Sequence, residues 1–302
     1  MNVIETHNLT RRFGRTEAVV ALELAVPTGS VCALLGPNGA GKSTTIKMLM
    51  NLLNPTAGEA RVLGVDSRRL GPRQFEQIGY VSENQVLPLW MTVRQLLDYC
   101  RPFYPTWDLG LERQLISQMA LPEDRALRHL SRGLLMKAAL LSSLAYRPKL
   151  LVLDEPFSGL DPLVRDELVK GIIEVSAAGD WTVFVSSHDI EEVERMTDHV
   201  VLIDGGRMQL NEPTDALQAR FRRVEVDLAQ ESDAPSHPGW LEVARSGRRV
   251  SFVDSGYDEG ASQDTYGRLF PGASAVCHPM TLREIFLTLA RTNRQNAKGA
   301  AA

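Results

Sequence analysis

A glycine-rich segment between an apolar run and a helical pattern constrains the fold of this chain more than any other feature. It extends from Gly36 to Thr44 and reads GPNGAGKST. Its three glycines allow the backbone to turn tightly, so that successive N–H groups point inward and can surround phosphate groups. Val31–Leu35 before it predicts a buried strand, and the residues up to Leu49 predict a helix whose N-terminal dipole favours an anion. The segment therefore predicts a phosphate-binding loop within an α/β sheet.

Two side chains of this loop have specific tasks toward a nucleotide triphosphate. Lys42 supplies a full positive charge for the β- and γ-phosphates, and Ser43 offers a hydroxyl to Mg²⁺. The alternative is a glycine-rich structural turn, and the loop alone does not indicate what the nucleotide is used for. The other residues predicted to bind the nucleotide from this loop are Gly36, Pro37, Asn38, Gly39, Ala40, Gly41 and Thr44.

A second apolar run ends in two adjacent carboxylates. Leu150–Leu153 predicts a buried strand, and Asp154 and Glu155 follow it directly. Ligands of open α/β sheets lie at the carboxyl ends of the strands, where these side chains are expected. Asp154 would hold Mg²⁺ directly or through water, and Glu155 would orient or deprotonate an attacking water molecule. Without the phosphate-binding loop upstream, a solvated acidic turn would be the better interpretation.

Composition limits the remaining classes of function. The 302 residues carry a net charge of −4, whereas nucleic-acid-binding proteins usually have a basic excess. Cys32, Cys100 and Cys277 share no close spacing, which argues against a disulfide framework and a zinc site. The N-terminus lacks the pattern of a secretory signal, and no run approaches the ~18 apolar residues that span a bilayer. If the protein acts at a membrane, we expect another chain to supply the spans.

The order of strand-like and helix-like segments predicts the domain organisation. Buried apolar strands alternating with helices indicate an α/β fold with a mostly parallel core sheet, preceded by N-terminal antiparallel strands. Residues 85–145 read as a mainly helical subdomain. Near Arg220 the pattern changes to half-exposed strands, so we predict a first domain at 1–216 and a small α+β domain at 217–292. Residues 293–302 are predicted to be a flexible tail.

From about residue 2 to 215 the chain resembles the nucleotide-binding subunit of ATP-binding cassette (ABC) transporters. The motif Ser158-Gly159-Leu160-Asp161-Pro162 matches the D-loop of that family, where Asp161 can cap a helix beginning at Pro162. The resemblance places this loop at a dimer interface. It also implies that His188 contacts the γ-phosphate and helps to organise the attacking water. Phe13 occupies the place of the aromatic residue that stacks on adenine, although a core phenylalanine is an alternative.

Two motifs depart from the family pattern. Leu130-Ser131-Arg132-Gly133-Leu134 stands where the family has Leu-Ser-Gly-Gly-Gln, so an arginine replaces a glycine and a leucine replaces a glutamine. The resemblance implies that Ser131 and Gly133, at a helix N-terminus, contact the γ-phosphate bound by a partner subunit. Glu83 stands at the glutamine position of the Q-loop, where a carboxylate can still bind Mg²⁺ or its water. Gln85 would take this role if the loop shifts by two residues.

The resemblance implies an ATPase that binds ATP and Mg²⁺, with Lys42, Glu155 and His188 as its catalytic residues. Two chains, identical or related, would enclose two ATP molecules and drive separately encoded membrane permease subunits. The arrangement is similar to ABC-2-type export subunits, so we expect an exporter component on the cytoplasmic face of the cell membrane. The apolar loop Leu87–Met91 is either a small subcore or part of the groove for a membrane partner. The alternative function is a non-transport or weakly hydrolysing regulatory ABC ATPase.

Overall fold

The computed structural model describes residues 1–177, 181–228, 235 and 237–299, and the chain divides into two compact units, Met1–Asn211 and Glu212–Ala302. The boundary falls inside strand β11 (Arg207–Pro213), slightly before the position expected from the sequence, residue 216. No helix within the described ranges is both long enough and apolar enough to cross a membrane.

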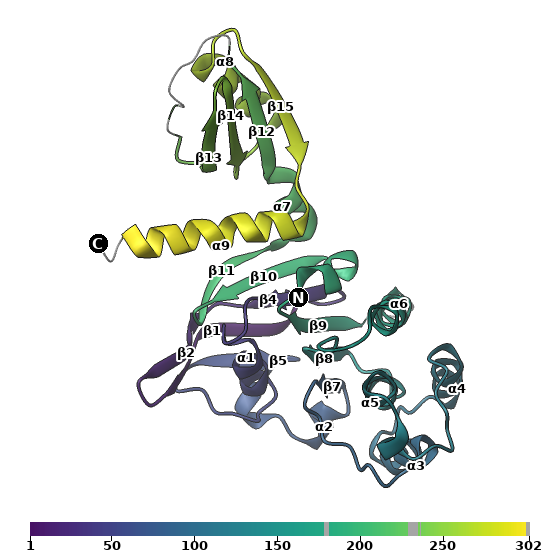
Figure 1. The fold of residues 1–302 in the computed structure, drawn as a ribbon. Coiled ribbons are helices and arrows are strands. Elements are labelled where there is room, and N and C mark those ends of the chain that lie inside the picture. Colours follow the sequence, from purple (N-terminus) through teal and green to yellow (C-terminus); the bar gives the residue numbers. More distant parts are fainter. Residues whose placement is uncertain (178–180, 229–234, 236, 300–302) are drawn as a thin grey trace. The chain divides into compact units, whose positions relative to one another are not determined.

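The central sheet of the first unit has six strands in the order β11–β10–β4–β9–β8–β7 (Figure 1). Neighbouring strands from β10 to β7 are parallel, as the alternation of strands and helices predicts. All residues of β4, β8 and β9 are buried, which explains why these strands read as continuous apolar runs. The strands besides β11 are β4 (Val31–Leu35), β7 (Ile78–Ser82), β8 (Leu150–Asp154), β9 (Thr182–Ser187) and β10 (His199–Asp204).

The register of these parallel strands brings three loops to one edge of the sheet. Leu35 of β4 pairs with Ser187 of β9, and Asp154 of β8 pairs with Ser186 of β9. The residues that follow β4, β8 and β9 therefore begin side by side, at the carboxyl ends where ligands bind open α/β sheets.

A second, antiparallel sheet is built around the N-terminal strand, as predicted. Strand β1 pairs with β2, β3 and β5, and β5 pairs with β6. Ile4 of β1, Ile46 of helix α1 and Val201 of β10 belong to one fully buried apolar cluster, which packs the two sheets onto α1. The bounds are β1 (Asn2–Phe13), β2 (Thr16–Leu22), β3 (Ala25–Pro27), β5 (Ala57–Val62), β6 (Val65–Asp66) and α1 (Lys42–Leu49).

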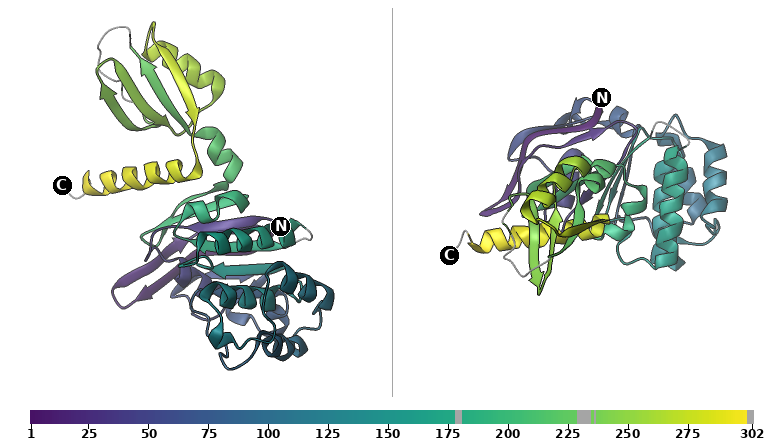
Figure 2. Two further views of the ribbon diagram at one scale, coloured as in Figure 1. Left: turned by 45° about the vertical axis from the view of Figure 1, so that its right-hand side comes forward. Right: turned by 90° about the horizontal axis from the view of Figure 1, so that it is seen from above.

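Helices α3, α4 and α5 lie together beyond the β7 edge of the central sheet, and α5 packs against β7 (Figures 1 and 2). Side chains that stabilise helix N-termini set where each begins. Thr92 and Gln95 form a capping box on α3, Asp108 accepts two backbone N–H bonds at α4, and Ser131 caps α5. The helices of this unit are α2 (Pro72–Phe75), α3 (Val93–Cys100), α4 (Leu109–Gln118), α5 (Arg132–Leu144) and α6 (Pro162–Ala177), with 3₁₀ turns at Ser67–Arg69, Arg101–Phe103, Leu127–His129, Ile190–Glu192 and Glu194–Met196.

The second unit is an α+β structure with its own core. Its antiparallel sheet has the order β13–β14–β12–β15, and α8 covers one face (Figure 2). Trp240 and Phe252 stack at 3.9 Å and join Tyr266 and Phe270 of the α8 region in one aromatic cluster. Such rings bury large apolar areas, so this cluster explains how a small unit forms a core. Its elements are α7 (Thr214–Arg220), β12 (Arg222–Asp227), β13 (Trp240–Ser246), β14 (Arg249–Asp254), α8 (Glu259–Leu269), β15 (Ser274–Pro279) and α9 (Leu282–Gly299).

Residues 293–302, for which the sequence predicts a flexible tail, begin inside a helix, and their flexibility stays a prediction. Helix α9 continues to Gly299, and only residues 300–302 of that segment lie outside the described part of the chain. The polar composition after Arg291 suggested a frayed end, but Asn, Arg, Gln, Ala and Lys can extend a helix that packing has already nucleated. Leu282 and Ile285 are fully buried in its first turns and supply that packing.

Candidate functional site

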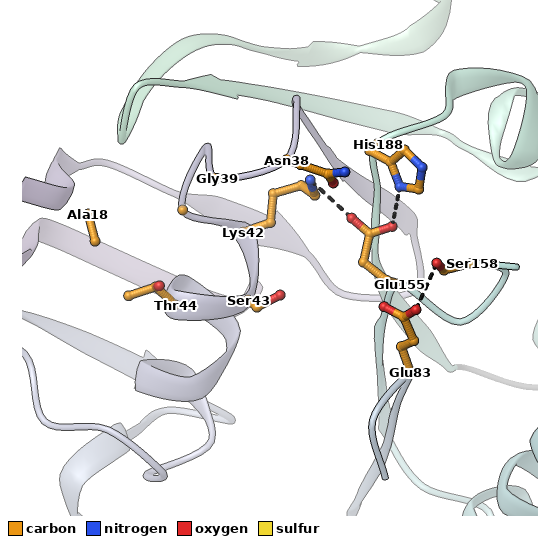
Figure 3. Close-up of a pocket in the computed structure, with 11 residues that line it drawn as sticks. Ala18, Asn38, Gly39, Lys42, Ser43, Thr44, Glu83, Glu155, Ser158 and His188 are labelled. Atoms are coloured by element: carbon orange, nitrogen blue, oxygen red, sulfur yellow. Dashed lines mark hydrogen bonds and ion pairs between the residues drawn. The ribbon is translucent and has the colours of Figure 1, made fainter.

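A cavity of about 470 Å³ lies at the carboxyl edge of the central sheet (Figure 3). It is bounded by the phosphate-binding loop, by the loop after β7, by the residues after β8 and by the residue that follows β9. Polar groups predominate in its lining, as a phosphorylated ligand requires. The lining residues are Ala18, Asn38, Gly39, Gly41, Lys42, Ser43, Thr44, Glu83, Glu155, Ser158 and His188.

The phosphate-binding loop has the tight geometry that its glycines predict. Gly41 has a φ of +105°, and a Cβ atom there would lie 2.4 Å from the carbonyl oxygen of Ala18. A Cβ atom at Gly36 would lie 2.1 Å from the carbonyl oxygen of Ile203. Both contacts exclude any side chain, so the strands on either side hold the loop closely. Helix α1 begins at Lys42 and directs its N-terminal N–H groups into the loop.

Lys42 is the buried cation of the site. Its Nζ donates hydrogen bonds to the carbonyl oxygens of Gly36 at 2.7 Å and Pro37 at 3.2 Å. The third partner of the ammonium group is Oε1 of Glu155, at 3.0 Å. Three acceptors match the three N–H donors of a lysine, so the side chain is held at the mouth of the loop (Figure 3).

Glu155 connects Lys42 to His188. One carboxylate oxygen is paired with Lys42, and the other, Oε2, lies 2.7 Å from Nδ1 of His188 (Figure 3). An ionised carboxylate only accepts hydrogen bonds, so Nδ1 carries the proton in this contact. The backbone of Glu155 has a φ of +52°, a left-handed conformation that is rare outside glycine. Strain of this kind gathers at functional sites and here turns the side chain out of the strand and into the cavity.

Ser43 and Asp154 form the predicted metal-binding pair. The Ser43 hydroxyl donates to Oδ1 of Asp154 at 3.0 Å, and Ser186 of β9 donates to the same oxygen at 2.8 Å. Among the described residues no group of three or more His, Cys, Asp or Glu side chains could hold a metal. Two hard oxygen donors nevertheless suit Mg²⁺, which is commonly bound by one or two protein groups and takes its other ligands from phosphates and water. The pair therefore fits a metal bound together with a nucleotide.

Ser186 supports both acidic residues of this strand end. Besides its bond to Asp154, its hydroxyl accepts the backbone N–H of Glu155 at 3.0 Å. One buried hydroxyl thus orients the carboxylate that is predicted to bind metal and stabilises the turn that carries Glu155. Ser186 has no function that its sequence context predicts, because a serine in an apolar strand carries no signal of its register with the neighbouring strand.

Glu83 lines the cavity, whereas Gln85 lies outside it in a neighbouring groove. Oε1 of Glu83 accepts a hydrogen bond from Ser158 at 2.9 Å and an ion pair from Nη2 of Arg132 at 2.6 Å. Partial burial works to raise the pKa of Glu83, but the bonds from Ser158 and Arg132 outweigh it and lower the pKa below its ordinary value. Glu83 is therefore ionised at neutral pH.

A model of the ABC transporter family matches residues 19–158. An uncharacterised ABC transporter ATP-binding protein of Nostoc is 31% identical over 266 residues, which cover 84% of this chain and 76% of the relative. This chain belongs to the ABC transporter ATP-binding proteins.

Two further relatives support the same family. The bacitracin transport ATP-binding protein BcrA of Bacillus licheniformis is 29% identical and is matched over 77% of each chain. The solved structure of cbiO1 from Clostridium perfringens, described as part of the ABC transporter complex cbiONQ, has a TM-score of 0.62 and 25% identity. The match covers 72% of this chain and 91% of cbiO1. The fold is thus that of an ABC ATPase cassette, as the motifs predict.

Eight predicted site residues do not line the cavity. Gly36, Pro37, Ala40 and Asp154 are next to lining residues in the sequence, and the other four belong to separate motifs. Ser131 accepts the N–H of Leu134 at 3.3 Å, and Asp161 accepts that of Leu163 at 2.9 Å, so each caps the helix that follows it. Gly133 packs against α6, where a Cβ atom would lie 2.7 Å from Val164. A structural reason for that glycine therefore exists beside its expected role toward a partner subunit.

The fourth is Phe13, at the end of β1. Its ring is half-exposed, and the guanidinium of Arg11 lies over it at 4.5 Å from the centroid. Such a cation–π contact is worth about 0.5–1 kcal/mol at an exposed site and holds the ring in place. The stacking of Phe13 on adenine stays a prediction.

Besides Ser186, three residues of the cassette that contribute to the site were not assigned to it from the sequence: Ala18, Ser158 and Arg132. Ala18 contributes to the cavity from β2, and Ser158 binds Glu83 from the loop after β8. Ser158 is part of the D-loop motif, and this motif was the signal that could have assigned it to the site. Ala18 and Arg132 reach the site through the packing of distant segments, which a sequence read locally does not reveal.

Proposed function

We propose that this ATP-binding subunit hydrolyses ATP with Glu155 as its general base. The observation that carries the proposal is the carboxylate of Glu155, which Lys42 and His188 hold from either side at the rim of the phosphate-binding loop. A base of this kind must be oriented before it can act, and both of its oxygens are fixed here.

The reaction assigns a separate task to each side chain. Glu155 takes a proton from water as the water oxygen attacks the γ-phosphorus, and the bond to the leaving oxygen of ADP breaks. Lys42 and the N–H groups of the loop stabilise the charge that develops on the phosphate oxygens. Mg²⁺, held by Ser43 and Asp154, would neutralise part of that charge when bound. His188 keeps the carboxylate in place and offers a group that can contact the γ-phosphate.

We further infer that a complete site needs two chains, from a homodimer or a heterodimer with a related subunit. Ser131 is exposed, lies at the N-terminus of α5 and does not line the cavity of its own chain. A helix N-terminus is a suitable place for a phosphate, so Ser131 would serve the nucleotide of a partner. Asp161, which is also exposed, would lie at the same interface.

Mixing two inactive variants tests the composite site. Lys42→Ala destroys the phosphate loop, whereas Ser131→Asp places a negative charge opposite the partner's phosphate. Aspartate is as good an N-cap as serine, so the second variant is expected to fold. In a homodimer, an equimolar mixture should recover about a quarter of wild-type ATPase activity, because half of the dimers are mixed and each contains one intact site.

The steady-state ATPase rate of the mixture and of each variant alone is the measurement. Recovery requires that the two residues act in different chains. A mixture as inactive as its components, in a preparation shown by sedimentation to form dimers of identical chains, would contradict the composite site.

We propose that the subunit drives an integral membrane permease, as part of an exporter on the cytoplasmic face of the membrane. Val86 and Trp90 have 93% and 70% of their surface exposed, in the loop that follows Glu83. Leu87, Leu135 and Met136 line a small groove of about 100 Å³ beside this loop. Exposed apolar groups next to a groove are typical of protein-binding surfaces. The bacitracin transport relative supports export, and the net charge of −4 argues against nucleic acid as the partner.

Changing Val86 and Trp90 to serine tests this docking surface. We expect the double variant to lose most of its association with the membrane fraction of producing cells, while the ATPase rate of the purified chain stays within about twofold of wild type. Leu52→Ser is the matched control, because Leu52 is also an exposed apolar residue and lies outside this loop. Membrane association that survives the double substitution would exclude the loop as the docking site.

A further inference from the structure

Two of the positions where this chain departs from the family pattern are in contact. Arg132 replaces a glycine of the signature motif, Glu83 replaces the glutamine of the Q-loop, and their side chains form an ion pair of 2.6 Å between Nη2 and Oε1. We propose that Arg132 is a positioning residue for the ATPase reaction, which holds the N-terminus of α5 in register with the nucleotide cavity through Glu83. This inference rests on the hydrolytic function proposed above.

The pair belongs to a cluster that joins three motifs. Oε1 of Glu83 also accepts the hydroxyl of Ser158 at 2.9 Å, so one oxygen connects the Q-loop, the signature helix and the D-loop. Gly159 adds a steric contact, because a Cβ atom there would lie 2.8 Å from Nη1 of Arg132. The guanidinium therefore lies directly against the D-loop backbone as well as against the carboxylate.

The course of the backbone explains why this contact matters for position. Strands β7 and β8 are parallel neighbours, and the chain between them leaves the sheet to form α3, α4 and α5. At the point of departure the N–H of Glu83 donates to the carbonyl of Asp154 at 2.9 Å, which fixes Glu83 to the metal-binding strand. Arg132 is the first residue of α5. The ion pair thus fastens the start of α5 to the edge of the sheet that carries the catalytic residues.

The solvent exposure of the ion pair predicts that its loss will change the reaction rate and not the stability of the fold. The Arg132 and Glu83 side chains are 51% and 30% exposed, and ion pairs at such positions contribute little to stability. Its loss should therefore slow the reaction without lowering the melting temperature. The pair also argues against Glu83 as a metal ligand, since a carboxylate that is neutralised by a guanidinium binds Mg²⁺ more weakly.

A double-mutant cycle in the full-length protein tests the proposal with Glu83→Gln, Arg132→Ala and the combination of both. We expect each single variant to lower kcat about tenfold and the double variant to be no slower than either, because all three lose the same ion pair. The KM for ATP and the Mg²⁺ concentration at half-maximal rate should stay unchanged. Arg94→Ala is the matched control: its ion pair with Glu123 spans 2.9 Å at similar exposure, 56% and 32%, and no effect is expected.

Other outcomes would overturn the assignment. A rise in the Mg²⁺ requirement of Glu83→Gln alone would make Glu83 a metal ligand. A rise in the KM of Arg132→Ala alone would make Arg132 a direct phosphate ligand, and full activity in both would leave the pair without a role. If the wild type binds ATP without hydrolysing it, the proposed function fails. The same cycle is then measured on ATP-dependent dimerisation by sedimentation, where equal and non-additive losses support the positioning role and their absence refutes it.

Discussion

A Glu155→Gln variant should bind ATP with wild-type affinity and hydrolyse it at a rate lower by a factor of about 10²–10⁴. Glutamine has the shape of glutamate but cannot accept a proton from water at neutral pH. Its carbonyl oxygen can still receive the hydrogen bond from Lys42, which in the wild type spans 3.0 Å. The substitution therefore removes the base and leaves the phosphate-binding loop in place.

Because the nucleotide persists, this variant should also form a stable dimer at saturating ATP. Single-turnover hydrolysis and sedimentation with and without ATP give the two measurements. Glu174→Gln is a suitable control, since Glu174 is an exposed glutamate of α6. This control variant is expected to hydrolyse ATP at the wild-type rate. Wild-type turnover in Glu155→Gln would show that another group activates the water. A monomer in saturating ATP would contradict the composite site.

Lys42→Ala is expected to weaken ATP binding at least about 100-fold, because it removes the one full positive charge among the lining residues of the cavity. The same change leaves the carboxylate of Glu155 buried without its cation, which costs folding free energy. Fluorescence titration with a labelled ATP analogue gives the affinity, and a thermal melt shows whether the variant is folded. Lys42→Met, which keeps the apolar stem, separates the loss of charge from the loss of packing.

Lys47→Ala is the matched control for this prediction. Lys47 lies on the same helix, α1, but its side chain is exposed, so its removal should leave the affinity for ATP unchanged. If folded Lys42→Ala or Lys42→Met protein bound ATP as the wild type does, the assignment of the phosphate-binding loop would be wrong.

The residues that could be predicted from the sequence are those whose signal is local. The phosphate-binding loop, Asp154–Glu155 and His188 each follow an apolar run that reads as a buried strand, and parallel neighbours place their carboxyl ends at one edge. The loop glycines were predictable for the same reason, because only glycine fits where the backbone of another segment lies very close. The mostly parallel sheet follows directly from these runs.

The contacts that escaped prediction depend on tertiary structure. Glu83 and Arg132 are 49 residues apart in the chain, and each alone looked like a weakened motif, whereas together they form an ion pair. The hydroxyl of Ser186 reaches Asp154 only because β8 and β9 pair in one particular register. Helix α9 extended beyond its apolar face for a related reason, since buried residues in its first turns stabilise a polar continuation.

The segment that follows β7 connects the nucleotide site to the exposed apolar loop over a short distance. Glu83 touches the cavity, and Val86 stands exposed three residues later in the sequence. Three residues of extended backbone span at most about 10 Å. A partner that binds the exposed loop would therefore act on the nucleotide site through a connection no longer than helix α1, whose eight residues span about 12 Å.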